Sequence, residues 1–362
     1  MQEIPSFCPY QSVCGGCPAF DENIDAYKTF KRRMVKEALS PLSVTDIKDV
    51  VFIPAGTRRR VTFALDWHGP VRRFGLNMPK SHKVVEINAC ACLKKTLSGL
   101  IVPLRSFFTD KKRRFLKKEG TGDVALTATD GGVDMTVTLP FAPDALWRAD
   151  LAVFAQQNAI ARVSWRQKPF DAPEPLACFS KPFVKIAGYD VLFPAGGFLQ
   201  PSEEGQAVLT DAVLSFVGEK PKKVVDLFCG LGTFTLPLMR KKRKIRAVDS
   251  AADAVAALAR AGQGSVETEE RDLFRMPLWT DEFSGVDAVV FDPPRAGAEA
   301  QCRQLAASDV PVIVAVSCSL KTFVRDAGIL TGGGYVLQSV VPVDQFVYSD
   351  HLELVAKFVR KR

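Results

Sequence analysis

Short apolar segments alternate with amphipathic ones over the second half of the chain. From about residue 190, five apolar runs have the length of buried strands: residues 224–228, 244–248, 288–294, 312–318 and 353–359. Helical periodicity is found between several of them, at residues 233–240, 251–262 and 320–330. Because strands and helices alternate at this spacing, we predict an α/β domain with a doubly wound, Rossmann-like parallel sheet over residues 190–362.

The first sixty residues show a different pattern. Turn-forming residues are frequent over positions 1–20. The stretch from residue 21 to residue 39 has helical periodicity, with five large side chains near one face: Ile24, Tyr27, Phe30, Met34 and Leu39. A turn-rich segment has no apolar core to order it. We therefore expect residues 1–20 to be ordered by something other than a core, and residues 1–60 to form a small N-terminal segment that includes the helix.

Residues 61–189 are predicted to form a central α+β domain rich in strands. Four β-type segments lie around its first boundary, at residues 50–56, 58–69, 71–78 and 82–88. Further on, a basic helical stretch spans residues 94–120, a hairpin turns at residues 130–132, and a helix and a strand follow over residues 145–165. Four prolines between residues 169 and 182 predict a stiff connector to the C-terminal domain.

Composition narrows the class of protein. The chain has 362 residues, 47% of them hydrophobic, so it can bury more than one core and is not a disordered polymer. No apolar run reaches the ~18 residues of a membrane span, and the first residues do not resemble a signal peptide. We therefore expect a cytoplasmic protein without a membrane segment, acting as a monomer. Its net charge of +8 would attract a polyanion such as nucleic acid.

Four basic stretches are candidates for contacting nucleic acid: residues 58–60, 111–118, 240–244 and 360–362. Phe107, Phe108 and Phe115 interleave with the second stretch, a pattern compatible with RNA binding, although these rings could equally belong to a core. A single basic stretch is usually a solvated face.

Nine cysteines are distributed unevenly along the chain. Cys8, Cys14 and Cys17 form a C-x5-C-x2-C pattern, and Cys90 and Cys92 lie farther on. Disulfide frameworks are typical of short secreted chains, so in a reducing cytoplasm these thiols indicate metal ligation. Three thiolates from the first segment and a fourth from Cys90 or Cys92 suit a [4Fe–4S] cluster or zinc. The wide first interval and the long gap favour the cluster.

A glycine turn follows the first strand of the C-terminal domain. In DLFCGLGTF, Gly230 and Gly232 let the backbone approach a ligand closely, and the N-terminus of the next helix favours an anionic group. A nicotinamide dinucleotide site would have a third glycine where Thr235 stands. Asp249 after the second strand suits ribose hydroxyls, and Asp272 follows the third strand. These residues favour S-adenosylmethionine as the cofactor.

Three reactive side chains are placed at strand ends beside the same edge of the sheet. Two prolines hold Asp292, and Arg295 stands where an amine methyltransferase would have an aromatic residue. Cys318 follows the next strand and is a candidate nucleophile if a neighbour such as Arg325 lowers its pKa. Glu353 opens the last strand and is a candidate base. Methylation of a pyrimidine at C5 needs both, because a thiolate must add to C6 and a base must then remove the C5 proton.

Together these motifs resemble the bacterial RNA uracil-C5 methyltransferase family, which is class I and S-adenosylmethionine-dependent, over nearly the whole chain. FCPYQSVCGGC is similar to the iron–sulfur segment of the 23S rRNA enzymes, and EINACACL to the segment with the fourth ligand, which implies Cys90 rather than Cys92. FLQPS, DLFCGLGTF, FDPPRAG, VSCSLKTFVRD and HLE are similar to further motifs of the family. The resemblance implies Cys318 as the nucleophile, Glu353 as the base, a [4Fe–4S] cluster on Cys8, Cys14, Cys17 and Cys90, and cofactor contacts from Gln200, Phe228, Gly230, Gly232, Thr233, Asp249, Asp272 and Asp292.

The chain departs from the family pattern in two respects. Ser202, Thr233 and Ser319 stand where the family most often has asparagine, so contacts to the cofactor and the base are expected to differ. There is no room before Cys8 for the small β-barrel RNA-binding module of some members. We therefore expect the basic central domain and the cluster region to hold the RNA.

The resemblance implies transfer of a methyl group to C5 of a specific uridine in 23S rRNA, giving 5-methyluridine through a covalent bond between Cys318 and C6. A uridine in tRNA is the alternative substrate. Two other functions stay open: an RNA or DNA amine methyltransferase, and a cluster-bearing RNA-binding protein without catalysis. The first would keep its activity in Cys318→Ala, and the second would bind RNA without transferring a methyl group.

Overall fold

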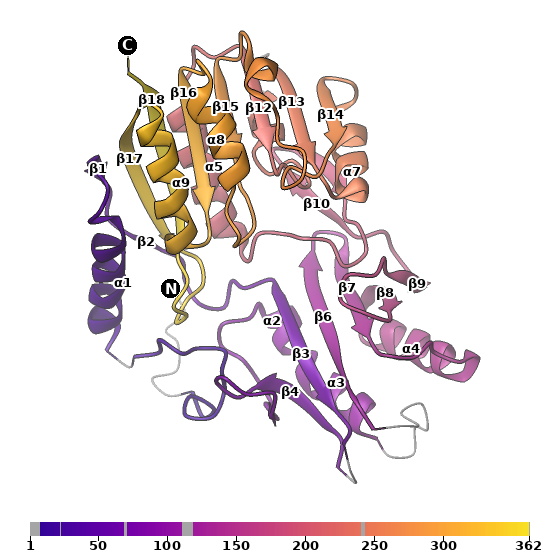
Figure 1. The fold of residues 1–362 in the computed structure, drawn as a ribbon. Coiled ribbons are helices and arrows are strands. Elements are labelled where there is room, and N and C mark those ends of the chain that lie inside the picture. The colour runs from indigo at the N-terminus through magenta and orange to yellow at the C-terminus, as the bar shows by residue number, and fades with distance from the viewer. Residues whose placement is uncertain (1–7, 22, 69–70, 111–118, 240–242, 362) are drawn as a thin grey trace.

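Two large sheets organise the chain (Figure 1). The computed structural model describes residues 8–21, 23–68, 71–110, 119–239 and 243–361. Within these ranges, one sheet has nine strands and the other seven, and a two-stranded hairpin is formed by β10 (Phe183–Ile186) and β11 (Tyr189–Leu192). The two large sheets lie one above the other in Figure 1, with residues from both ends of the chain in the upper one.

The larger sheet confirms the predicted doubly wound domain. Five of its strands are parallel and lie in the order β14-β13-β12-β15-β16. Their bounds are β12 (Lys223–Leu227), β13 (Lys244–Asp249), β14 (Val266–Glu270), β15 (Ala288–Phe291) and β16 (Val312–Ser317). The order reverses between β12 and β15, and in such sheets ligands bind beyond the carboxyl ends of the strands at that point.

Two antiparallel strands complete the C-terminal part of this sheet. β18 (Glu353–Arg360) pairs with β16, and β17 (Tyr335–Asp344) pairs with β18. Because β17 runs antiparallel to β18, its last residue, Asp344, lies at the same end of the sheet as Glu353, the first residue of β18. The connecting residues 345–352 therefore border the carboxyl edge of the parallel strands.

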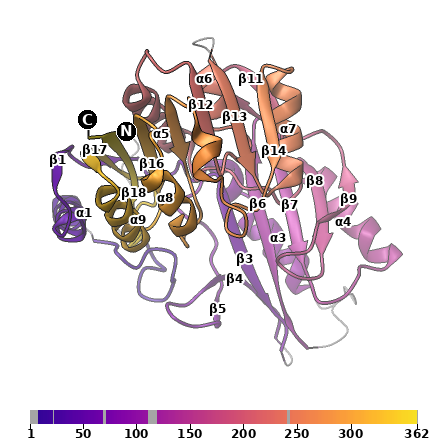
Figure 2. The same ribbon diagram turned by 45° about the horizontal axis from the view of Figure 1, so that its top comes forward.

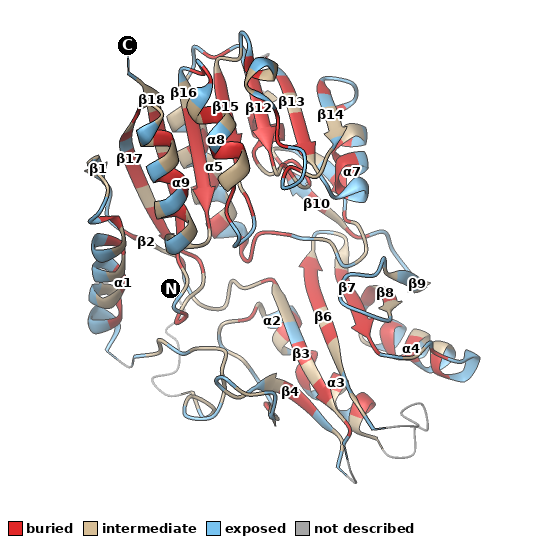
Figure 3. Cartoon of the chain, viewed as in Figure 1, coloured by how far each residue is buried: buried red, intermediate tan, exposed pale blue. Residues whose placement is uncertain are grey.

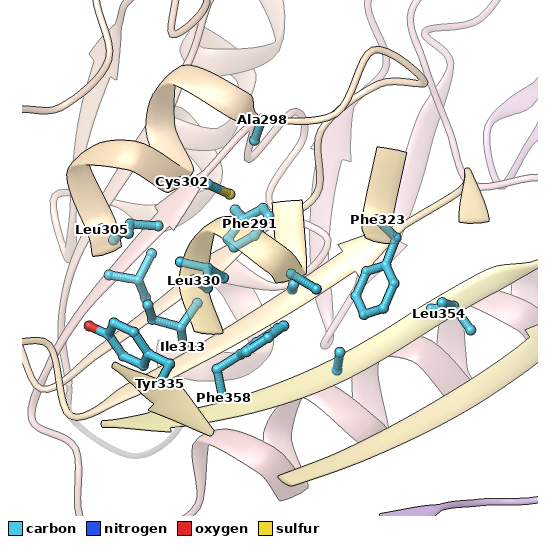
Figure 4. Packing of buried hydrophobic residues seen from close by; sticks show 14 of the residues in the cluster. Phe291, Ala298, Cys302, Leu305, Ile313, Phe323, Leu330, Tyr335, Leu354 and Phe358 are labelled. Atoms are coloured by element: carbon cyan, nitrogen blue, oxygen red, sulfur yellow. The ribbon is translucent and has the colours of Figure 1, made fainter. Parts of the chain in front are cut away.

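Helices cover both faces of this sheet, and the strands between them are mostly buried (Figure 3). One apolar core lies between the sheet and α8 (Glu299–Ala307) and α9 (Leu320–Gly332), where Phe291, Cys302 and Phe358 pack together (Figure 4). A second core lies against α5 (Glu203–Val217) on the other face. The remaining elements are α6 (Thr235–Met239), α7 (Ala252–Gly262) and the 3-10 turn η1 (Thr280–Phe283).

The N-terminal helix packs against the C-terminal domain. α1 (Ile24–Leu39) contacts α9, while β1 (Val44–Ile47) and β2 (Val51–Phe52) each pair in parallel with β17. The buried face of α1 consists of Tyr27, Lys31, Val35 and Leu39. The expectation that Ile24 lies on this face is wrong, because Ile24 is 45% exposed and a lysine takes part in the face instead.

The seven-stranded sheet confirms a strand-rich α+β arrangement in the centre of the chain (Figure 2). Its order is β5-β4-β3-β6-β7-β8-β9, and β6 and β7 form the predicted hairpin. The strands are β3 (Arg60–Asp66), β4 (Arg73–Asn77), β5 (Val84–Val85), β6 (Thr121–Thr129), β7 (Gly132–Thr138), β8 (Ile160–Arg166) and β9 (Glu174–Cys178). Three helices pack with them: α2 (Lys95–Ser98), α3 (Ile101–Thr109) and α4 (Ala145–Gln157).

Two expectations for this central part need correction, and a choice that the sequence left open is settled for Phe107 and Phe108. The predicted helix over residues 94–120 is two helices that end at Thr109, and residues 111–118, with Phe115, lie outside the described residues. Phe107 and Phe108 are buried core residues and so are not free to stack on RNA. The proline-rich connector contains a strand, β9, which pairs with β8.

No helix of the described ranges is long and apolar enough to cross a membrane.

Candidate active site

The glycine turn after β12 has the backbone geometry that the sequence predicts. Gly230 and Gly232 have φ angles of +51° and +85°, and Phe228, just before them, has φ +59°. A Cβ on Gly232 would lie 2.4 Å from Leu258 Cδ1 in the neighbouring helix α7, so the close packing of turn and helix requires glycine there. A strained non-glycine residue such as Phe228 is frequent at functional sites.

Asp249 connects this turn to the end of β13. Its Oδ2 accepts a hydrogen bond from Gly230 N at 2.8 Å, and its Oδ1 accepts one from Ala251 N at 2.8 Å. At the next strand end, Asp272 accepts a hydrogen bond from Phe274 N at 3.0 Å. The Phe274 ring is half exposed and lies 5.5 Å from the Phe228 ring. Phe274 is not among the residues that the sequence motifs indicate, although an aromatic residue two positions after Asp272 is compatible with a place beside the same turn.

Thr235, where a dinucleotide site would have glycine, has an internal role. Its buried hydroxyl donates to Asp226 Oδ2 at 2.5 Å, and burial raises the pKa of the Asp226 carboxyl to about 7. The hydrogen bond therefore satisfies one oxygen of a carboxyl group that has lost its contact with water. Thr233, two residues earlier, is half-buried in the same turn.

A chain of hydrogen bonds links Asp292 to the segment before β18. Gln200 Nε2 donates to Asp292 Oδ2 at 3.0 Å, and Gln345 Nε2 donates to Gln200 Oε1 at 3.0 Å. Both glutamines are nearly fully buried. Burial raises the pKa of Asp292 to about 7, and the nearby charge of Asp249 adds to the shift. Gln200 thus lies against Asp292 in the cleft.

Two arginines of the first basic stretch hold the Gln200 segment in place. Arg59 Nε donates to the carbonyl oxygen of Gln200 at 2.9 Å, and Arg60 Nη1 donates to that of Leu199 at 2.8 Å. Arg59 is only 3% exposed. The interpretation of residues 58–60 as a solvated or RNA-facing basic patch is therefore wrong for Arg59, which joins the central sheet to the cleft.

Glu353 is a buried carboxyl group at the start of β18. It is 3% exposed, and among the described residues its Oε2 has no hydrogen-bond partner. Its pKa is raised to about 8. Burial is the largest cause and the charge of Asp292 acts in the same direction, while a hydrogen bond with Gln345 and the charge of Arg295 oppose the shift. A carboxylate with a raised pKa is a stronger base than one in water.

Cys318 follows β16 and is influenced by the same charges. Burial raises the pKa of its thiol to about 12, the charges of Glu353 and Asp292 add to the shift, and Arg295 opposes it. The structure therefore brings Cys318, Glu353 and Asp292 close together at the carboxyl edge of the parallel strands. Arg325, which the sequence suggested as the activating neighbour, is held elsewhere: its Nη2 donates to Ala296 O and contacts Asp326. The cation that acts on Cys318 is Arg295.

Five cysteines surround one cavity beside this cleft. Cys8, Cys14 and Cys17 line a space of about 340 Å³ together with Cys90 and Cys92. Cys17 Sγ and Cys92 Sγ are 3.7 Å apart. Arg295 and His351 line the same space, so the cysteine cavity borders the candidate active site. The two segments, far apart in sequence, therefore meet as predicted.

The cysteine cavity does not show the geometry of a single-ion site. Over the described ranges, no three His, Cys, Asp or Glu side chains are arranged to hold one metal ion. A zinc ion would draw four ligands to about 2.3 Å from one point. A cubane cluster binds each thiolate through a different iron, so its ligands stand farther apart. Thiolate donors suit either an iron–sulfur cluster or zinc.

Comparison with known proteins finds relatives along nearly the whole chain. An RNA methyltransferase of Agrobacterium fabrum is 37% identical over 350 residues, which are 95% of this chain and 82% of that one. The 23S rRNA (uracil(1939)-C(5))-methyltransferase of Aeromonas salmonicida is 30% identical over 98% of this chain and 82% of its own. The structure of Pyrococcus abyssi tRNA (uracil-54, C5)-methyltransferase with S-adenosyl-L-homocysteine matches with a TM-score of 0.73, at 24% identity over 97% and 86% of the two chains. No family model matches.

The doubly wound sheet, the glycine turn and the acidic residues at its carboxyl edge define a Rossmann-like domain, the fold that the chain shares with the S-adenosyl-L-homocysteine-bound tRNA enzyme. Within that class, the chain belongs to the RNA methyltransferase family of these relatives, a family that includes the 23S rRNA uracil-C5 enzyme. The predicted Rossmann-like fold and the predicted RNA methyltransferase class are thereby confirmed.

Proposed function

We propose that this enzyme methylates C5 of a uridine in 23S rRNA and forms 5-methyluridine through a covalent bond between Cys318 Sγ and C6. The observation that carries the proposal is the proximity of a thiol, Cys318, and a buried carboxyl, Glu353, which lie close enough for the charge of Glu353 to raise the pKa of the thiol. Methyl transfer to an amine needs neither group. The name of the Aeromonas salmonicida relative supports 23S rRNA as the substrate.

The residues divide the reaction between them. The target uridine is turned out of its RNA structure into the cleft. Cys318 loses its proton to solvent, and its sulfur adds to C6, which makes C5 nucleophilic. After methylation, Glu353 removes the C5 proton; the electrons of that C–H bond form the C5=C6 double bond, and the Cys318 thiolate leaves. Asp292 and Arg295 hold the base or the rim of its pocket.

The cofactor pocket is proposed to lie along the carboxyl ends of β12, β13 and β14. Gly230, Gly232 and Thr233 border the methionine part, Asp249 the ribose, and Asp272 the adenine. Phe228 lines this pocket and Gln200 contacts the cofactor from the Asp292 side. When bound, S-adenosylmethionine supplies the electrophilic methyl group. The turn geometry supports this placement, since Gly232 allows no side chain beside Leu258.

We further propose that Cys8, Cys14, Cys17 and Cys90 hold a [4Fe–4S] cluster in the cysteine cavity. The convergence of both thiol-bearing segments on one space supports this assignment. Methyl transfer includes no electron-transfer step, so the reaction does not need the redox chemistry of a cluster. The cluster would therefore supply structure: it would order the turn-rich segment 8–21 and shape the surface that meets the RNA beside Arg295 and His351.

The proposal assigns a role to each of three parts of the chain: residues 1–60 hold the cluster, residues 61–189 form a central RNA-binding domain, and residues 190–362 form the methyltransferase domain.

A uridine in tRNA is the second candidate substrate. It is favoured by the match to the fold of a tRNA uracil-54 enzyme over nearly the whole chain.

The nucleoside product tests this function. Purified enzyme is incubated with S-adenosylmethionine labelled in its methyl group and with either 23S rRNA or tRNA lacking modifications, and the digested nucleosides are separated. We expect label in 5-methyluridine from 23S rRNA, lost in Cys318→Ala and kept in Cys178→Ala, whose exposed thiol lies outside the cleft. Label in tRNA alone would select the second candidate. Label on an exocyclic amine, or RNA binding without label transfer, would contradict uracil-C5 methylation.

A further inference from the structure

A buried ion pair connects the N-terminal helix to the end of β17. Lys31 Nζ of α1 is 3.0 Å from Asp344 Oδ1, and the two side chains are 0% and 1% exposed. Tyr27, one turn earlier in α1, donates its hydroxyl hydrogen to Asp344 Oδ2 at 2.5 Å. Charges removed from water hold a defined geometry only when such partners surround them. This lysine is therefore fixed, unlike most lysines on a helix.

The same two side chains of α1 hold the segment that leads to Glu353. Lys31 Nζ also donates to the carbonyl oxygen of His351 at 2.6 Å, and the Tyr27 hydroxyl accepts a hydrogen bond from Tyr348 N at 2.8 Å. α1 thus contacts both the beginning of this segment, at Asp344, and its end, two residues before Glu353. Residues 345–352 are clamped against one helix.

The clamped segment connects the groups that act on the base. At its first residue, Gln345 donates to Gln200, which in turn contacts Asp292. At its other end, His351 Nε2 lies 2.8 Å from Arg295 Nη2, and β18 begins with Glu353. The Glu353 Oε2 atom has no hydrogen-bond partner among the described residues, so the position of the carboxyl group depends on the hydrogen bond with Gln345 and on the backbone of the clamped segment.

We propose that Lys31 is a positioning residue for Glu353: by fixing the His351 carbonyl relative to Asp344, it places the Glu353 carboxylate at the C5 proton. The inference rests on the proposed uracil-C5 chemistry and assigns Lys31 to a single step of it. Addition of Cys318 to C6 and methylation at C5 precede the contribution of Lys31. Removal of the C5 proton, with formation of the C5=C6 bond and departure of the Cys318 sulfur, depends on it.

The test separates these steps by trapping. Lys31→Met enzyme is mixed with ordinary target RNA and methyl-labelled S-adenosylmethionine, denatured at intervals and run on a gel. If Glu353 is misplaced, the methylated RNA should stay bound to protein, as in Glu353→Gln, with release slowed by about 10–100-fold. Arg32→Met is the matched control, because Arg32 is next to Lys31 but half exposed and pairs with Asp49 on the outside of α1.

A variant with an unpaired buried charge is at risk of misfolding, so two further variants are included. Lys31→Met with Asp344→Asn removes both charges, and Tyr27→Phe removes only the hydroxyl that contacts Asp344 and Tyr348 N. Each is also given RNA with 5-fluorouridine, whose C5 carries no removable proton after methylation. Folded enzyme with a working Cys318 must form the adduct with this RNA.

The outcomes separate the inference from the function on which it rests. Normal trapping on fluorinated RNA together with accumulation of adduct on ordinary RNA supports the positioning role. Release from ordinary RNA at the wild-type rate overturns it. Loss of trapping on fluorinated RNA in all three variants also overturns it, because the network then supports the fold as a whole. Failure of the wild-type enzyme to trap fluorinated RNA would instead contradict the proposed function.

Discussion

At the scale of single residues, burial has a larger effect than any neighbouring cation on the groups of the cleft. It is the first cause of the raised pKa values of Cys318, to about 12, Glu353, to about 8, and Asp292, to about 7. Arg295 opposes the first two shifts without reversing them. Before RNA binds, the thiol is therefore protonated at neutral pH, and so is most of Glu353.

The raised pKa of Glu353 predicts how proton removal depends on pH. Glu353 acts as a base only in its carboxylate form, whose population increases as the pH rises through about 8. We expect release of tritium from C5-labelled RNA in a single turnover to accelerate over that range. Glu353→Gln should slow release by about 10²–10⁴-fold, and Glu267→Gln, on the exposed part of β14, should not. A rate that falls between pH 7 and pH 9 would contradict this role.

The raised pKa of Cys318 predicts a slow thiol in the free enzyme. The thiolate is the reactive form, so iodoacetamide should modify Cys318 more slowly at pH 7 than the exposed Cys178 of the same chain. Glu353→Gln should accelerate the modification, because removal of a negative charge lowers the pKa of the thiol. Peptide mass spectrometry measures both sites in one sample. Faster modification of Cys318 than of Cys178 at pH 7 would show that another group activates the thiol.

At the scale of elements, the strands of the C-terminal domain could be predicted because both faces of a parallel sheet are buried. Their sequences are therefore continuous apolar runs, and the proposed catalytic residues stand at the ends of these strands. The partners of those residues could not be predicted in the same way. Arg325 is seven residues from Cys318 but is held by Asp326 and Ala296 O, whereas Arg295 reaches the cleft from another strand end.

Helices were predicted less completely than strands for a related reason. The periodicity of residues 24–39 indicates a helix, but a buried lysine in it is recognisable only once its distant partner is known. Lys31 lies on the buried face because Asp344, more than three hundred residues away, neutralises it. Ile24 is exposed although it is apolar. Side-chain pairing across the fold, rather than local pattern, decides the position of Lys31.

The packing of the glycine turn against α7 gives a prediction about stability. Gly232→Ala adds a Cβ 2.4 Å from the fully buried Leu258 Cδ1, whereas a Cβ on Gly264, also at positive φ, meets nothing within 4 Å. We expect Gly264→Ala to lower the free energy of unfolding by about 1 kcal/mol through backbone strain alone. Gly232→Ala should lower it by about 1–3 kcal/mol more through overpacking. Equal losses in denaturant titrations would show that the clash is relieved.

At the scale of the whole molecule, contacts between distant segments assemble the site. β1 and β2 extend the C-terminal sheet, Arg59 joins the central sheet to Gln200, and the cysteine cavity lies between residues 8–17, residues 90–92 and the segment before Glu353. The sequence motifs indicate the residues proposed for the site. They do not indicate which residues hold them, because those contacts depend on the folded chain.

The cysteine cavity gives a prediction at this scale. Cys90→Ser should abolish binding of a [4Fe–4S] cluster after anaerobic reconstitution, measured as iron and acid-labile sulfide per chain, and Cys92→Ser should retain it. The pair is a stringent test because Cys92 Sγ lies only 3.7 Å from Cys17 Sγ. Loss of the cluster in Cys92→Ser alone would make Cys92 the fourth ligand. Stable zinc binding without sulfide would contradict the cluster.

Covalent capture of RNA tests the proposed chemistry most directly. Wild-type enzyme, S-adenosylmethionine and 23S rRNA fragments containing 5-fluorouridine are combined, and the products are separated under denaturing conditions. The fluorine cannot be removed by Glu353, so we predict a methylated protein–RNA adduct whose peptide map places the RNA on Cys318 and which is absent in Cys318→Ala. Methylation of ordinary RNA without any adduct on fluorinated RNA would contradict the Cys318 mechanism.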